Sequence, residues 1–220
     1  INAATLAEAQ AAVQTILDFE NAGLALSGKA TLVADNPDQA GDFEANQDEI
    51  ATLLPSRPVD KLFLTQLGAT ATKTAVRNAF DSGLSLVSYV GHGSSGLWAT
   101  EGILRSPDVA TFGPQPQQPL VLTMTCSNGY FVSPYNNSLS ERLVLAEAKG
   151  AIASFSPSGL SLNDAAHVYH RAVVSELELG SHERLGDLLL AAQAQYAASG
   201  AFPELLDFYN LLGDPGLRVR

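Results

Sequence analysis

The chain of 220 residues contains little sulfur and little positive charge. It has one Cys, one Met and one Trp, so no disulfide can form within it and the fold must depend on core packing. Lys and Arg number 12 against 23 Asp and Glu, which gives a net charge of −11. The basic residues are scattered along the sequence, and an acidic surface repels a phosphate backbone, so we expect no nucleic-acid partner.

Long hydrophobic runs are also absent. No apolar segment approaches the roughly 20 residues that a membrane-spanning helix needs, and no charged region followed by an apolar one marks a signal peptide. The sequence starts at Ile1 and enters a helical pattern almost at once. We therefore expect a processed product or a fragment of a longer chain, with no predicted membrane span.

The remaining composition is that of a globular protein. Hydrophobic residues make up 46% and charged residues 16%, and the length suits a single α/β domain over residues 1–220. The acidity suits cationic peptides or calcium, and equally a soluble surface kept monomeric by repulsion. Calcium remains a possibility without a motif, because no twelve-residue loop with alternating oxygen ligands is present.

Short apolar runs alternate with amphipathic segments along the chain. The runs predict strands near 30–34, 61–65, 84–90, 120–125 and 151–155, and three-and-four spacing predicts helices near 5–22, 44–54, 73–81, 139–148, 164–179 and 185–198. Strand–helix alternation of this kind predicts a mostly parallel sheet with helices on both faces.

Two of the predicted strands end in reactive side chains. The run 84–90 leads into Gly91-His92-Gly93, and the run 120–125 leads into Cys126. Ligands of open α/β sheets bind outside the carboxyl ends of the strands, so an imidazole and a thiol there suggest a general base and a nucleophile. The amides of Gly93 and Cys126 are candidate donors to an oxyanion. Either residue alone would more often be a buried cysteine or a turn histidine, but the two patterns together favour catalysis.

Three motifs resemble the gingipain family, which lies in the caspase-like clan of cysteine peptidases. They are Tyr89-Val90-Gly91-His92-Gly93, then Thr125-Cys126-Ser127-Asn128-Gly129-Tyr130-Phe131, then Tyr209-Asn210-Leu211-Leu212-Gly213-Asp214-Pro215. The resemblance covers nearly the whole chain and implies a three-layer caspase-like fold. Its opening helix looks like the start of that family's catalytic subdomain, which implies an upstream subdomain or propeptide.

The resemblance implies a cysteine endopeptidase with Cys126 as nucleophile, His92 as proton donor and an oxyanion site at the Gly93 and Cys126 amides. It also implies an acid beyond an earlier strand that orients the histidine, and Asp35 occupies that place. Asp35 equally suits a helix cap or a turn. No cofactor is required by this chemistry.

Specificity residues are also implied by the resemblance. The P1 pocket of such enzymes is partly walled by the segment after the next strand, here Ser154, Phe155, Ser156 and Ser158. Basic-P1 members use a buried acid, for which Asp42 and Glu44 are candidates, although first-turn carboxylates of a helix explain both. Trp98 either packs in the core or borders the substrate groove.

Other sites and functions are less well supported. His167 and His170 share a helix face without a third ligand, so no metal site is predicted, and the stretch 91–96 lacks the context of a phosphate loop. Two alternatives to an endopeptidase stay open: a secretion-associated signal peptidase or transpeptidase of the same family, and a non-catalytic domain that binds a protein partner. The resemblance implies secretion or the cell surface, while a cytoplasmic location stays open.

Overall fold

A six-stranded sheet forms the centre of the protein, with the strand order β2-β1-β3-β7-β8-β9. Its strands are β1 (Ala30–Ala34), β2 (Val59–Phe63), β3 (Leu86–Val90), β7 (Leu120–Met124), β8 (Ala153–Pro157) and β9 (Tyr209–Leu212). Five run parallel, and β9 is antiparallel to β8. The computed structural model describes residues 3–220, so Ile1, on which the expectation of a processed chain rests, lies outside the described residues.

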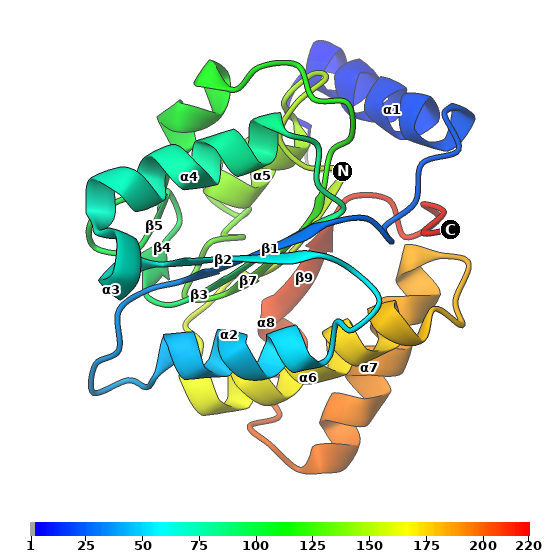
Figure 1. Cartoon of the computed structure of the whole chain (residues 1–220). Coiled ribbons are helices and arrows are strands. Elements are labelled where there is room, and N and C mark those ends of the chain that lie inside the picture. Colours follow the sequence, from blue (N-terminus) through cyan, green and yellow to red (C-terminus); the bar gives the residue numbers. More distant parts are fainter. Residues whose placement is uncertain (1–2) are drawn as a thin grey trace.

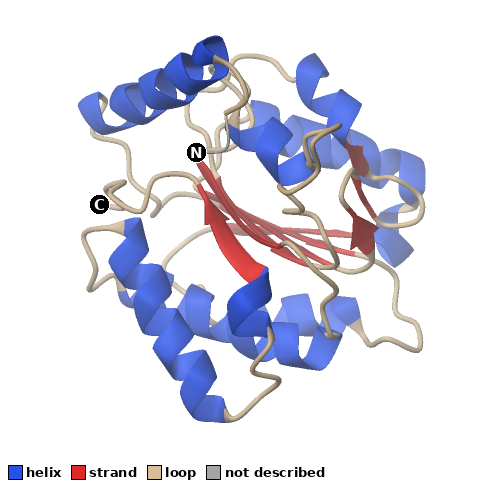
Figure 2. Cartoon of the chain, turned by 180° about the vertical axis from the view of Figure 1, so that it is seen from behind, coloured by secondary structure: helices blue, strands red, loops and turns tan. Residues whose placement is uncertain are grey.

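Helices cover both faces of this sheet, giving three layers (Figures 1 and 2). One face packs against α2 (Phe43–Thr52), α6 (Asn163–Leu179) and α7 (Leu185–Ser199), and the other against α4 (Ala69–Asp81) and α5 (Leu139–Val144). The helix α1 (Leu6–Asn21) lies at one corner (Figure 1). Because both faces are covered, β1, β3, β7 and β8 are buried along their whole length, which explains the mostly apolar sequences of β1, β3 and β7.

The predicted fold class is confirmed: the sheet is mostly parallel and helices flank it. Each predicted strand and helix has a counterpart, but β8 ends at Pro157, two residues later than expected, and α5 ends at Val144, earlier than expected. The unpredicted elements are short. They are α3 (Leu64–Leu67), β4 (Gly93–Ser94), β5 (Leu97–Trp98), β6 (Leu104–Arg105), the 3₁₀ helix η1 (Ser106–Thr111), α8 (Leu205–Phe208) and β9.

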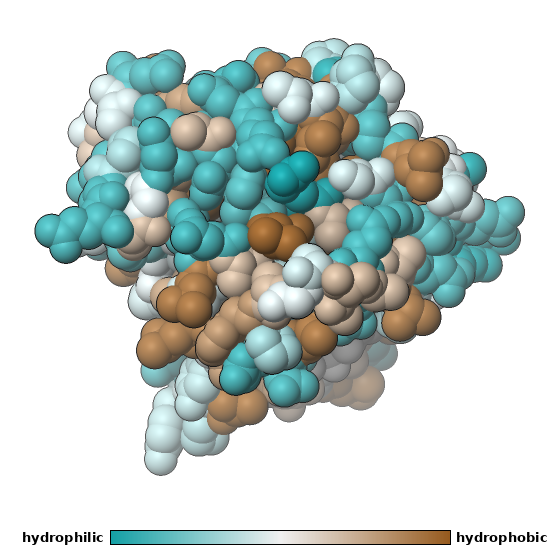
Figure 3. Space-filling model, turned by 90° about the horizontal axis from the view of Figure 1, so that it is seen from below, coloured by the Kyte–Doolittle hydropathy of each residue, from teal (hydrophilic) through white to brown (hydrophobic). Residues whose placement is uncertain are grey.

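The small elements β4, β5 and β6 form a second, antiparallel sheet immediately after β3. This sheet belongs to the segment that carries His92, so it sets the path of the chain beyond the carboxyl end of β3. Among residues 3–220, none of the helices has both the length and the apolar character to cross a bilayer. Seen from the side of α2, α6 and α7, hydrophilic residues cover one half of the surface, and hydrophobic residues are more frequent in the other half (Figure 3).

Candidate active site

The carboxyl ends of three neighbouring strands lie level at one edge of the sheet. In the strand register, Ala34 of β1 is paired with Val90 of β3, and Val90 is paired with Met124 of β7. His92 lies two residues after Val90, and Cys126 lies two residues after Met124, just beyond the ends of the adjacent parallel strands β3 and β7. The imidazole and the thiol therefore belong to the same rim of the sheet, where neighbouring strands are about 4.8 Å apart.

Two glycines allow the chain to turn closely around His92. Gly91 has φ of 152°, and a Cβ atom built on it would lie 2.6 Å from the hydroxyl oxygen of Tyr89. A Cβ atom on Gly93 would lie 2.5 Å from the Thr125 Oγ1 atom. Both positions therefore require a residue without a side chain.

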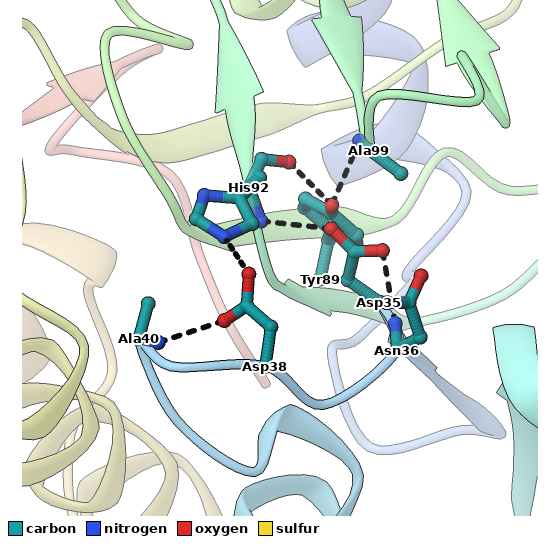
Figure 4. A network of polar contacts seen from close by, with 7 residues as sticks. All are labelled: Asp35, Asn36, Asp38, Ala40, Tyr89, His92 and Ala99. Carbon is teal, nitrogen blue, oxygen red and sulfur yellow. Dashed lines mark hydrogen bonds and ion pairs between the residues drawn. The ribbon is translucent and has the colours of Figure 1, made fainter.

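The ring of His92 is held by a carboxylate from the loop after β1. Its Nε2 atom lies 2.8 Å from Asp38 Oδ2, and the Ala40 amide donates to Asp38 Oδ1 at 2.8 Å (Figure 4). These hydrogen bonds, first that of Ala40 and then that of His92, hold the pKa of Asp38 below its ordinary value. Phe43 packs edge-on to the imidazole at 5.4 Å between ring centroids. The imidazole thus keeps one orientation while its side chain stays 48% exposed.

Asp35 acts on the backbone of His92 instead of its ring. Its Oδ2 atom accepts a hydrogen bond from the His92 amide at 3.0 Å, and its Oδ1 atom accepts one from Asn36 at 2.9 Å (Figure 4). Burial raises the pKa of Asp35 above its ordinary value, against the opposing effect of these two amides. The ring contact expected for Asp35 is made by Asp38.

A buried aromatic pair supports the other side of the His92 backbone. The Tyr89 hydroxyl donates to the His92 carbonyl at 2.5 Å and accepts from the Ala99 amide at 2.8 Å. Trp98 stacks on Tyr89 with a 4.6 Å centroid separation and donates its Nε1–H to Asn128 Oδ1 at 3.0 Å. Trp98 is 0% exposed. Of the two interpretations of this residue, the structure therefore agrees with packing in the core and not with a place beside a substrate groove.

The thiol of Cys126 contacts the loop after β8. The Ser161 amide donates to Sγ at 3.5 Å, and Sγ donates to the Ser161 carbonyl at 3.7 Å. The side chain is partly exposed. Within residues 3–220 the Cys126 amide has no hydrogen-bond acceptor, which leaves it available as a donor to a substrate atom.

The chain turns sharply after the cysteine. Ser127 has φ of 54°, in the left-handed region that is rare for a residue with a side chain, and its amide donates to the Gly159 carbonyl at 2.8 Å. Asn128 is 0% exposed and donates from Nδ2 to the Ser94 carbonyl at 2.8 Å. The segment after β7 is thus tied both to the loop after β8 and to the small sheet after His92.

A sequence profile of peptidase family C25 matches residues 1–220. The chain belongs to peptidase family C25. The predicted resemblance to gingipains is thereby confirmed, and solved gingipain structures share its fold. None of the curated proteins compared with the chain matches it.

Three solved structures illustrate the fold of this C25 family member. The Arg-specific cysteine proteinase gingipain R (RgpB) is 20% identical, with a TM-score of 0.76, over 87% of this chain and 47% of that one. A complex of Porphyromonas gingivalis RgpB pro- and mature domains is 20% identical, with a TM-score of 0.75, over 87% of this chain and 48% of that one. A structure described only as a protease is 14% identical, with a TM-score of 0.78, over 98% of this chain and 54% of that one. The chain therefore spans about half the length of these proteins.

Most residues expected to wall a P1 pocket in this C25 chain lie inside the protein. Ser154 and Ser156 are 0% exposed and Phe155 is 3% exposed. They are buried because they lie within β8, which continues to Pro157 and is covered on both faces. The accessible part of the segment starts at Ser158.

The two acids proposed for a basic P1 residue are already engaged. Asp42 caps α2 by accepting the Ala45 amide at 2.9 Å. Glu44 accepts the Thr65 amide at 3.1 Å and the Thr65 hydroxyl at 2.6 Å. Asp42 is thus the N-cap residue of α2, and Glu44, the acid in the first turn of this helix, also joins α2 to α3.

The remaining histidines of this C25 chain form no metal site. His170 is buried against Ser88 Oγ at 2.8 Å, whereas His167 contacts Glu49 at 2.8 Å on the surface. Over residues 3–220 no three His, Cys, Asp or Glu side chains are grouped closely enough to hold a metal ion.

Proposed function

We propose that this C25 family member is a cysteine endopeptidase with Cys126 as nucleophile and His92 as general acid and base. The observation that supports this most strongly is the placement of both residues two positions beyond the level ends of β3 and β7. A thiol and an imidazole at one rim of a parallel sheet suit acyl transfer.

The proposed reaction begins with proton transfer from the Cys126 thiol to His92. Because Nε2 of the ring donates to Asp38, Nδ1 carries the lone pair that takes this proton. The thiolate then attacks the scissile carbonyl carbon, and the amides of Gly93 and Cys126 stabilise the oxyanion. The imidazolium gives its proton to the departing amine, which leaves a thioester on Cys126. Water attacks this thioester, with His92 now acting as base, and releases the carboxylic acid and the free thiol.

We infer a basic P1 residue from charge. The chain carries a net charge of −11, and the similar protein gingipain R is described as Arg-specific. Cleavage of a positional peptide library checks this preference. Selection of Arg or Lys at P1 supports it, whereas selection of large apolar residues would assign P1 recognition to the exposed Leu160 and Leu162 beside Ser161.

We also propose a propeptide or upstream subdomain as a partner and assign no step to a cofactor. The similar RgpB has been solved as a complex of pro- and mature domains, and this chain spans about half of such proteins. Thiol, imidazole and backbone amides supply every proton and donor that the proposed reaction uses.

The proposed function is tested with Cys126→Ala and His92→Ala. Peptide cleavage should be lost in both, while the melting temperature stays close to that of the parent protein because both side chains lie at an open rim. His167→Ala is the matched control, since His167 also pairs with a carboxylate at 2.8 Å but lies on α6. Product masses separate hydrolysis from transfer to an amine, and unaltered cleavage by Cys126→Ala would refute the proposal.

A further inference from the structure

The loop between β8 and α6 holds the thiol through a single residue. Ser161 offers its amide to Sγ of Cys126 at 3.5 Å and its carbonyl oxygen at 3.7 Å. The neighbours Leu160 and Leu162 are 75% and 56% exposed, so they provide little packing that could fix this contact. The position of Ser161 must therefore come from other interactions.

Tyr209 provides one such interaction from β9, the last strand of the sheet. Its hydroxyl lies 3.0 Å from Ser161 Oγ, and the tyrosine is 3% exposed. Phe155 and Tyr169 each pack against its ring with 5.4 Å between ring centroids, and their own ring centroids lie 5.3 Å apart. Burial raises the pKa of Tyr209 above its ordinary value, so the hydroxyl stays protonated.

The start of the same loop is anchored by the next residue of β9. Asn210 donates from Nδ2 to Ser158 Oγ at 3.1 Å and to the Phe208 carbonyl at 2.7 Å. The Ser158 amide also donates to the Phe208 carbonyl at 2.7 Å. Two successive side chains of β9 thus hold the two ends of the segment 158–161, which connects the third sequence motif with the thiol.

We propose that Tyr209 is a positioning residue that holds the Ser161 amide against Cys126, so that this amide stabilises the thiolate. This inference rests on the proposed function, because it explains how the same nucleophile is kept ready. Tyr209 touches no reacting atom and acts only through Ser161.

The two contacts of Ser161 favour different states of the thiol. The neutral thiol donates to the Ser161 carbonyl, whereas the thiolate has lost that proton and accepts from the Ser161 amide. A hydrogen bond to an ionised acceptor is roughly twice as strong as one between neutral groups. The amide contact is therefore the one that strengthens when the thiol gives up its proton.

The test measures alkylation of the protein by iodoacetamide as a function of pH. Cys126 is the only cysteine, so the rate reports its ionisation alone. Tyr209→Phe and Ser161→Ala should each raise the apparent thiol pKa and slow alkylation about threefold to tenfold at pH values below it. The double variant should be no slower than either single variant, because both remove the same hydrogen bond. In peptide cleavage, kcat should fall and KM should stay unchanged.

Tyr196→Phe is the matched control. It also removes a hydroxyl from a fully buried tyrosine, one that donates to the Phe202 carbonyl at 2.6 Å. Its alkylation profile should equal that of the parent protein. An unchanged profile in Tyr209→Phe, or an equal shift in Tyr196→Phe, would overturn the proposal. Alkylation needs no peptidase activity, so an absence of cleavage by the parent protein would refute the proposed function while leaving this test intact.

Discussion

Two carboxylates from one loop hold different parts of His92. Asp38 contacts the ring at Nε2, and Asp35 accepts the backbone amide (Figure 4). Asp35 is 3% exposed, whereas the Asp38 side chain is 41% exposed. The buried carboxylate thus fixes the backbone, and the exposed one sets the tautomer and the orientation of the imidazole.

The first prediction concerns Asp38→Asn. The amide oxygen can still accept a hydrogen bond from Nε2, but the negative charge that stabilises the imidazolium formed during the reaction is lost. The value of kcat should therefore fall, while KM stays close to that of the parent protein. Because the pair is solvent-exposed, the loss should be less than about tenfold. Steady-state kinetics of peptide cleavage measure it.

Glu49→Gln provides the control for this experiment. Glu49 lies 2.8 Å from His167, the same separation as in the Asp38 pair, but it belongs to α2 and not to the rim. Its kcat should match that of the parent protein. An unchanged kcat in Asp38→Asn would show that the carboxylate contributes nothing to the reaction of His92.

At the scale of elements, the sequence was most informative where a pattern repeats. Apolar runs and three-and-four spacing located the large strands and helices, including the two strands that precede His92 and Cys126. The two-residue strands β4, β5 and β6 are too short to show an alternating or otherwise periodic pattern of apolar residues. The strand β9 was recognised only as a motif.

The details of the site were less predictable because they depend on how loops fold back. Asp35 is the first acid after β1 and was expected at the ring, but the turn through Pro37 brings Asp38 there instead. The contact between Ser161 and Cys126 joins residues 35 positions apart through backbone atoms, which leave no signal in side-chain chemistry. The buried state of Ser156 follows from a two-residue difference in where β8 ends, whereas Ser154 already lay within the predicted strand.

The second prediction concerns the packing of α6 on the sheet. His170 contacts Ser88 of β3, and burial lowers its pKa to about 3 from an ordinary value near 6.5. Between these two values the unfolded chain binds a proton that the folded protein excludes. The free energy of unfolding should therefore decrease as the pH falls below about 6.5, with a contribution of up to about 1.4 kcal/mol per pH unit from this residue.

Chemical denaturation of His170→Gln and His167→Gln measures this contribution. Carboxylates add their own pH dependence to every variant, so the informative quantity is the difference in slope from the parent protein. The slope should become shallower in His170→Gln and change less in His167→Gln, whose side chain is 14% exposed and paired with Glu49. Parallel curves for all three proteins would contradict the prediction.

At the scale of the whole molecule, acidic residues outnumber basic ones by 23 to 12. Many of the basic side chains are already paired with carboxylates at the surface, such as Lys29 with Asp60 and Lys61 with Asp48. The uncompensated charge is therefore negative, and its field attracts cationic peptides toward the protein as a whole. This attraction is separate from the contacts that select the P1 side chain.

The last prediction separates these two effects by salt. The Debye length falls from about 30 Å at 0.01 M salt to about 8 Å at 0.15 M, so long-range attraction is screened while close contacts persist. For a peptide with lysines on both sides of its P1 residue, kcat/KM should fall several-fold over this range. For a peptide with the same P1 residue and glutamines in place of those lysines, it should change little. Equal salt responses of the two peptides would show that the net charge of −11 does not guide substrate binding.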